Sequence, residues 1–154
     1  MADIINNIVG GRYYILELIG RGGSAIVYKA RDIHNGGIYA LKKYITSDPA
    51  NRKRLLEGME RELEVLKNCT HPVLPKIFDL IKIEDAFFLV MEYIDGIDLK
   101  KYVDEYGTLS TKMLVKVMEQ VCSGFYYLHS LSPAIVYRDL KPANIILCKD
   151  GRIK

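Results

Sequence analysis

VYRDLKPANIIL, residues 136–147, is the stretch of sequence on which the interpretation of the fold depends. Asp139, Lys141 and Asn144 stand close together here, next to a proline and ahead of an apolar run. An irregular loop that follows a helix can bring different polar groups to one point. The alternative is a plain surface turn built from Arg-Asp and Lys-Pro, and the rest of the chain must decide between the two.

Upstream of this stretch the hydrophobic period is that of a helix. Apolar residues recur every three or four positions over 110–129, which predicts a long helix, and residues 97–106 form a shorter helical segment. Gly96 marks the point where this pattern begins. The recurring apolar positions are Leu114, Val117, Val121, Phe125 and Leu128.

The first part of the chain is rich in β-branched and aromatic residues and predicts strands. A hairpin turn is expected at 35–37, and Asp48-Pro49 provides the start of a helix that reaches about residue 68. Together these patterns predict an α+β fold: a five-stranded antiparallel sheet with one helix, then a mainly helical part. The domain is expected to divide into lobes at 1–93 and 94–154. The predicted strands are 14–19, 26–30, 38–43, 74–80 and 86–92, the last two flanking a turn at 84–85.

Composition is that of an ordinary globular chain of one domain. The 154 residues are 49% hydrophobic and 27% charged, with a net charge of +3. A charge this small gives no argument for a nucleic-acid partner. No apolar run approaches the ~20 residues of a membrane span, and no secretory leader is evident. Three cysteines without metal-ligand spacing are read as buried thiols, so a reducing cytoplasmic location is expected.

A glycine-rich loop, GRGGSAIV, begins at Gly20. Glycines let backbone N–H groups approach phosphate oxygens, but the same residues can simply form a tight turn. The loop leads into a strand rather than a helix, which argues against a dinucleotide-binding loop. It also lacks the GK[ST] ending of a Walker loop.

Lys42 and Glu62 are interpreted as a buried ion pair. Side chains alternate along a strand, so Lys42 shares an otherwise apolar face with Ile38 and Ala40. Glu62 falls on the inward stripe of the helix that follows. Buried opposite charges are tolerated when they are paired. The alternative is that both side chains reach solvent at the edge of the lobe.

Residues 136–147 resemble the catalytic loop of the eukaryotic-like (Hanks-type) serine/threonine protein kinases, whose pattern is H-R-D-x-x-x-x-N, with Tyr137 in place of the histidine. The resemblance implies that Asp139 accepts the proton of the substrate hydroxyl. It likewise implies that Lys141 contacts the γ-phosphate and that Asn144 is a Mg²⁺ ligand. Lys141, two residues after Asp139, resembles the serine/threonine branch rather than the tyrosine branch.

Other features of that family appear in its order along nearly the whole chain. They include the glycine loop, YALK at 39–42, Glu62 of the regulatory helix, His71-Pro72, and VMEY at 90–93. The resemblance implies ATP and Mg²⁺ as cofactors, with Lys42 holding the α- and β-phosphates. The other nucleotide-binding positions that it implies in the glycine loop and the next strand are Gly20, Arg21, Gly22, Gly23, Ser24, Ala25, Val27 and Ala40.

The resemblance also implies where the base and ribose would bind. The backbone of Glu92 and Ile94 would hydrogen-bond adenine, Met91 would line the back of the pocket, and Asp98 would lie near the ribose. The chain stops at Lys154, before the D-F-G segment that follows in the family. The principal Mg²⁺-binding aspartate would lie in that segment, so this chain alone is expected to be inactive or very weakly active.

Two functions follow as hypotheses. The first is a serine/threonine protein kinase fragment that binds Mg-ATP and transfers its γ-phosphate to a protein hydroxyl, of a substrate that the sequence does not identify. The second is a catalytically inactive kinase-like module that binds a nucleotide or a partner. The first accounts for every motif, whereas the second accounts for the ending.

Self-association is predicted because the chain stops at Lys154, before the segments that follow in the family. The apolar face of the helix at 110–129 is expected to be exposed, and the strand at 152–154 to be an unpaired edge. The chain should therefore associate through Val117, Val121, Phe125 and their neighbours. Sedimentation velocity over a wide concentration range tests this, and a clean monomer throughout would contradict it.

Overall fold

The structure is a computed structural model that describes residues 4–22, 25–44, 56–57, 60, 63, 66–83 and 86–154. The chain divides into two compact units. The first comprises Met1–Cys69 and Lys76–Tyr93, and the second comprises Thr70–Pro75 and Ile94–Lys154. Each unit is described by itself.

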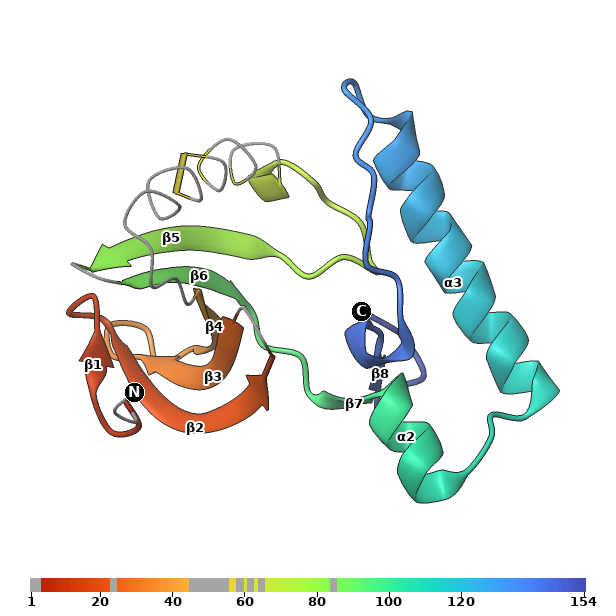
Figure 1. The fold of residues 1–154 in the computed structure, drawn as a ribbon, viewed down its shortest axis with the longest axis horizontal. Helices are drawn as coiled ribbons and strands as arrows, with labels where there is room; N and C mark the ends of the chain where they lie inside the picture. Colours follow the sequence, from red (N-terminus) through yellow and green to blue (C-terminus); the bar gives the residue numbers. More distant parts are fainter. Residues whose placement is uncertain are drawn as a thin grey trace. The chain divides into compact units, whose positions relative to one another are not determined.

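An antiparallel sheet forms the first unit (Figure 1). Among the described residues it has six strands in the order β1-β2-β3-β4-β6-β5, one more than the five predicted. The additional strand is β1, whose two residues pair with Tyr13 and Tyr14 of β2. The strands are β1 (Ile8–Val9), β2 (Tyr13–Arg21), β3 (Ala25–Asp32), β4 (Ile38–Tyr44), β5 (Ile77–Ile83) and β6 (Ala86–Glu92).

The pleat of β4 divides its side chains between two faces. Leu41 is fully buried and lies opposite Tyr28 of β3 and Val90 of β6, which are also buried. Lys42, the next residue, therefore projects from the opposite face of the sheet. The buried face forms the core of this unit, made of Val9, Tyr13, Ile15, Ile26, Tyr28, Ala30, Leu41, Phe88 and Val90.

A buried aspartate fastens the hairpin between β3 and β4 to the chain that precedes β2. The Asp32 side chain is fully buried, and its Oδ2 accepts from Arg12 Nε at 2.9 Å and from Arg12 Nη2 at 2.7 Å. Its Oδ1 accepts from the amide of His34 at 2.9 Å. The hydrogen bond from Arg12 lowers the pKa of Asp32, burial opposes this, and the His34 amide lowers it further.

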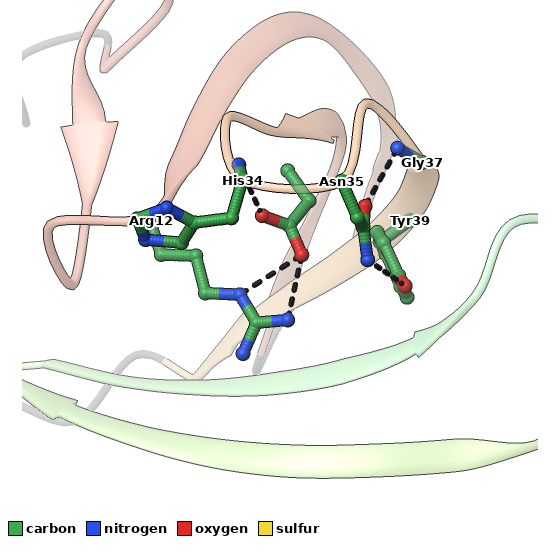
Figure 2. A network of polar contacts seen from close by, with 6 residues as sticks. Arg12, His34, Asn35, Gly37 and Tyr39 are labelled. Atoms are coloured by element: carbon green, nitrogen blue, oxygen red, sulfur yellow. Dashed lines mark hydrogen bonds and ion pairs between the residues drawn. The ribbon is translucent and has the colours of Figure 1, made fainter.

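The turn at 35–37 forms as predicted. Gly36 has φ 73°, a left-handed conformation that a glycine adopts without strain. Asn35 Oδ1 accepts from the Gly37 amide at 2.8 Å, and Asn35 Nδ2 donates to the Tyr39 hydroxyl at 3.3 Å. Figure 2 shows this group beside Arg12 and His34.

Two helices and a two-stranded sheet form the second unit. The predicted long helix is confirmed as α3 (Thr111–Ser130), with Ser110 Oγ accepting from the Met113 amide at its start. Figure 1 shows α3 as the long cyan helix. Gly96 begins β7 and approaches β8 so closely that a Cβ there would lie 2.4 Å from the Leu147 carbonyl oxygen. The remaining elements are β7 (Gly96–Asp98), α2 (Leu99–Tyr106), the 3₁₀ turn η1 (Pro142–Asn144) and β8 (Ile146–Cys148).

Most of the apolar stripe of α3, from Val117 to Leu128, is covered by the unit's own residues, which corrects the prediction of an exposed face. Val117 and Val121 are 2% and 5% exposed and pack with Leu99, Leu147 and Ile153. Self-association stays a prediction, but these two valines are not on the surface to mediate it. The exposed apolar residues of α3 are Leu114, Val115, Met118 and Tyr126.

The final residues are paired, so the prediction of an unpaired edge at 152–154 is wrong. Ile153 forms a bridge with Leu147 of β8, and Ile146 and Lys154 exchange both backbone hydrogen bonds, at 2.7 and 2.9 Å. The turn over 148–151 folds the chain back on itself, so the last residues find their partner locally.

The segment Thr70–Pro75 is held on α3. The Tyr127 hydroxyl accepts from the Thr70 amide at 2.9 Å, and the His71 ring stacks on the Tyr127 ring with centroids 5.2 Å apart. A Cβ at Gly124 would lie 3.3 Å from Val73, so the helix backbone approaches the segment closely. The strand predicted at 74–80 accordingly begins only at Ile77.

Several predictions concern other parts of the chain. The helix predicted over 48–68 falls largely outside the described residues, although those described between 56 and 67 are helical. Glu62 and the turn at 84–85 also lie outside them. The three thiols are not joined in disulfides, but none of them is fully buried as predicted: Cys122 is exposed, and Cys69 and Cys148 are half-buried. Among the described helices, none has the length and apolar character needed to span a membrane.

We predict that Asp32 makes the stability of the first unit fall at low pH. Its pKa is depressed in the folded state, so its contribution is present above the ordinary carboxyl pKa of about 3.9 and is lost as the pH falls through the folded value. Thermal unfolding from pH 7 to pH 2.5 should therefore show a steeper fall in Tm for the native chain than for Asp32→Asn.

Asp79→Asn is the matched control, because Asp79 is half exposed and lies 3.6 Å from Lys67. That variant should keep the steep fall. Parallel curves for the native chain and Asp32→Asn would contradict the role assigned to the buried pair.

Candidate active site

Local sequence shapes the loop that follows α3. Lys141 is extended, with φ −155° and ψ 156°, as expected for a residue that precedes a proline. Pro142 then begins the 3₁₀ turn η1, whose fixed φ suits the first position of a helical turn. The amide of Asn144 donates to the Lys141 carbonyl oxygen at 2.9 Å. These constraints return the side chain of Asn144 toward the start of the loop.

Asp139, Lys141 and Asn144 meet in this loop. Asn144 Nδ2 donates to the backbone oxygen and to Oδ2 of Asp139, each at 2.9 Å. Lys141 Nζ lies 2.8 Å from the same Oδ2. The Asp139 side chain is 67% exposed. The loop thus presents a carboxylate, an ammonium and a carboxamide together at the surface, which is what the sequence predicted.

Tyr137, which stands in the histidine position of the family pattern, lies beside this group. Its ring is tilted 37° to that of Phe125 on α3, with centroids 6.0 Å apart. Burial raises the pKa of the Tyr137 hydroxyl, and the negative charge of Asp139 raises it further. The tyrosine therefore packs the loop against α3, and the pKa of its hydroxyl depends on the charge of Asp139.

The hairpin after the loop is secured by a residue that sequence reasoning missed. Gln120 Oε1 accepts from the Ile153 amide at 3.1 Å, and its Nε2 donates to the Gly151 carbonyl oxygen at 3.4 Å. The signal was present, because Gln120 is a polar residue directly before the buried Val121 on the inward side of α3. By holding 151–153, Gln120 supports β8 and hence Asn144, which lies just before it.

Asp98 begins α2. Its Oδ1 accepts from the Lys101 amide at 2.9 Å, and the residue itself pairs with Ile146 of β8. The carboxylate therefore acts as an N-cap, which adds a structural function to the ribose contact implied by the resemblance. Among the described residues, no group of three His, Cys, Asp or Glu side chains is arranged as metal ligands would be.

The face of the sheet opposite the core of the first unit, which we call the open face, carries five of the predicted residues in two rows. Opposed residues of antiparallel strands lie on the same face, and their registers define the rows. The first row consists of Gly20, Val27, Lys42 and Leu89, and the second of Glu17, Lys29, Ala40 and Met91. Two positions of the second row, Glu17 and Lys29, were not predicted as site residues. Every second side chain of a strand lies on the same face, so the predicted position of Val27 on β3 would have indicated that Lys29 lies on that face too.

Lys42 is half buried on this face, with Nζ 5.2 Å from the centre of the Tyr44 ring. Its predicted ion pair with Glu62 lies outside the described residues. The neighbouring Lys43 is on the opposite face, with Nζ 5.7 Å from the centre of the buried Phe88 ring. The two lysines of one strand therefore project to opposite sides of the sheet.

The glycine loop connects β2 and β3. Gly20 pairs with Val27 and Arg21 with Ile26, so the strands are paired almost to the tip. The amide of Gly22 donates to the Ala25 carbonyl oxygen at 2.8 Å. The predicted positions Gly23 and Ser24 lie outside the described residues.

The end of β6 carries the positions expected to meet a base. Met91 lies opposite Ala40 on the open face, in the second row. The amide of Glu92 donates to the Lys76 carbonyl oxygen at 2.8 Å, and Glu92 Oε2 accepts from the Lys76 amide at 3.0 Å. Ile94 is half buried and begins the long second segment of the other unit.

A hollow of about 480 Å³, counted out to its open side, lies in the second unit next to the loop. Its walls are mostly apolar and come from the segment 73–75, from α3 and from the last residues of the chain. Tyr137, Leu140 and Asn144 line it on the side of the loop. The hollow therefore shares residues with the predicted catalytic loop.

We predict that the charge of Asp139 is detectable at Tyr137. Removing it in Asp139→Asn should lower the pKa of the Tyr137 hydroxyl, because the phenolate would no longer face a carboxylate. The measurement is a pH titration of ring-labelled tyrosine by NMR, with the Tyr137 signal assigned through Tyr137→Phe. Asp150→Asn, a substitution in the distal turn, should leave the titration unchanged, and an equal shift in both variants would refute the proximity.

Comparison with known proteins places this geometry in a family. The sequence model of the protein kinase domain matches residues 13–154. The serine/threonine-protein kinase PrkC of Bacillus subtilis is 37% identical over 98% of the chain, and the match covers 23% of that kinase. The probable serine/threonine-protein kinase PknB of Lactococcus lactis is 31% identical over 97% of the chain, covering 24% of its own length.

A solved structure has the same fold. The crystal structure of Rad53 in complex with AMP-PNP matches with a TM-score of 0.80 and 30% identity, over 93% of this chain and 37% of that one. The chain spans about a quarter of the length of the two bacterial relatives. With a kinase-like fold and the family model matching from β2 to the last residue, this chain belongs to the protein kinase domain family, and the relatives named above are serine/threonine-protein kinases.

Proposed function

We propose that this chain is part of a serine/threonine protein kinase that binds Mg-ATP and transfers the γ-phosphate to a hydroxyl of a protein substrate. The observation that carries the proposal is the meeting of Asp139, Lys141 and Asn144 in one loop. The names of the relatives favour an enzyme over a catalytically inactive binding module.

Asp139 is the proposed acceptor of the substrate hydroxyl proton. Its carboxylate is exposed, so a hydroxyl can approach it. Asn144 donates one hydrogen bond to this carboxylate and one to the backbone oxygen of Asp139, which fixes the position of the residue. A base that is already oriented avoids the entropic cost of finding its geometry during the reaction. Lys141, beside the same oxygen, is proposed to stabilise the negative charge of the phosphoryl group in transfer.

Nucleotide binding is proposed for the open face of the sheet in the first unit. Lys42 gives this face a cation in the row of Gly20 and Val27, where the β- and α-phosphates would lie. Ala40 and Met91 give the next row a small apolar surface for the base. The related structure of Rad53 is a complex with AMP-PNP, an ATP analogue.

Asn144 is proposed to contribute a ligand to Mg²⁺. Its amide nitrogen donates two hydrogen bonds to Asp139, so the oxygen of the same planar group points away from the aspartate. A carboxamide oxygen is the hard donor that Mg²⁺ prefers. The ion, when bound, neutralises negative charge on the phosphates.

We predict that Lys42→Met weakens ATP binding by about tenfold to a hundredfold, because a charge-assisted contact to phosphate is lost. Adenosine, which has no phosphates, should bind both proteins alike. Calorimetric titration of the 154-residue chain with each ligand, in the presence of Mg²⁺, gives the two affinities.

Lys43→Met is the matched control, since it removes the same charge from the opposite face of the same strand. It should bind ATP as the native chain does. Equal ATP affinities for the native chain and Lys42→Met would overturn the proposed phosphate contact, and failure of the native chain to bind ATP would overturn the nucleotide site.

A further inference from the structure

Glu17, Lys29 and Tyr93 form a polar group at one end of the open face, and we call these three residues the bracket. Lys29 Nζ lies 2.9 Å from Glu17 Oε1 and 4.8 Å from the centre of the Tyr93 ring. The three residues come from β2, from β3 and from the position just after β6. Lys29 of β3 therefore contacts β2, the other strand of the glycine-loop hairpin, and also the chain that follows β6.

The bracket lies at a defined position on the face. Lys29 is opposite Glu17 on one side and Ala40 on the other, and Ala40 is opposite Met91. This is the row proposed to meet the base, whereas Lys42 belongs to the row proposed to meet the phosphates. The row of the bracket therefore crosses β4 at Ala40, two positions before the proposed phosphate contact at Lys42.

The ammonium of Lys29 is engaged rather than merely solvated. The side chain is 26% exposed, which is low for a lysine. The hydrogen bond to Glu17 raises the pKa of Lys29, burial opposes this, and the neighbouring Tyr93 raises it further. The cation thus has an acid and an aromatic ring as partners within the same unit.

We propose that Lys29 is a positioning residue for the base of the nucleotide, acting by holding the glycine-loop hairpin and the end of β6 at a fixed separation. The inference rests on the proposed nucleotide site. Met91 and Glu92 directly precede Tyr93, so fixing Tyr93 restricts the backbone expected to meet the base. Glu17 fixes the other side, because β2 leads directly into the glycine loop.

The bracket is expected to influence binding more than stability. A partly exposed ion pair contributes little to the folding of a domain whose core lies on the other face of the sheet. A binding surface made of two strands and a chain end, however, loses order when their shared contact is removed. A stability effect and a positioning effect can therefore be told apart.

The test compares adenosine and ATP binding to the native 154-residue chain and to Lys29→Met, by calorimetric titration. Methionine keeps an unbranched apolar stem but lacks the charge. Both ligands should bind about threefold to fivefold more weakly, by the same factor, while Tm in the absence of ligand stays the same. Lys42→Met, in contrast, should weaken ATP alone.

Two further variants separate positioning from a general loss of charge. Lys29→Arg retains a cation that can reach both Glu17 and Tyr93, so it should restore most of the affinity for both ligands. Lys67→Met removes a lysine of the same unit that pairs with Asp79 at 3.6 Å, and it should bind both ligands as the native chain does.

Each outcome is decisive. Native affinities in Lys29→Met, or a loss confined to ATP, would overturn the positioning role while leaving the proposed nucleotide site intact. An equal loss in Lys67→Met, or a fall in Tm that accounts for the weaker binding, would also overturn it. If the native chain binds neither adenosine nor ATP, the proposed site fails and the inference fails with it.

Discussion

The two-residue period of the pleated strand is the constraint on which the arrangement of functional groups depends. On β4 it buries Leu41 in the core and turns Lys42 to the open face, and neither orientation is possible without the other. On β8 it buries Leu147 against α3 while the chain just before the strand carries Asn144. In the first unit a buried aliphatic residue thus fixes the direction of its polar neighbour, whereas in the second unit the 3₁₀ turn η1 directs Asn144.

Patterns with a clear period were sufficient to predict most of the elements. The β-branched and aromatic run at 38–43 and the helical stripe at 110–129 each indicated their element, and the stripe also indicated which side of the helix is buried. The loop at 136–147 was predicted by a different signal, the spacing of three functional residues, and Pro142 explains why that spacing brings them together.

The predictions that failed concern partners rather than elements. Strand β1 has only two residues, too few to show an alternation, and is held by pairing with β2. Val117 and Val121 were expected at the surface because the chain stops before the segments that would cover them in the family, but Leu99 and Ile153 of the same unit cover them. Lys29 was overlooked because its importance comes from Glu17 and Tyr93, which only the folded sheet brings near.

The segment Thr70–Pro75 has a consequence for the order of folding. It interrupts the sequence of the first unit, yet its hydrogen-bond partners Ser123 and Tyr127 lie 52 and 57 residues further along the chain. During synthesis it must stay undocked until most of α3 has been made, so closure of a long loop precedes its docking. Neither unit is a continuous piece of chain. A cut after Tyr93 would leave the segment Thr70–Pro75 on the first fragment, whereas α3, on which it docks, would be on the second.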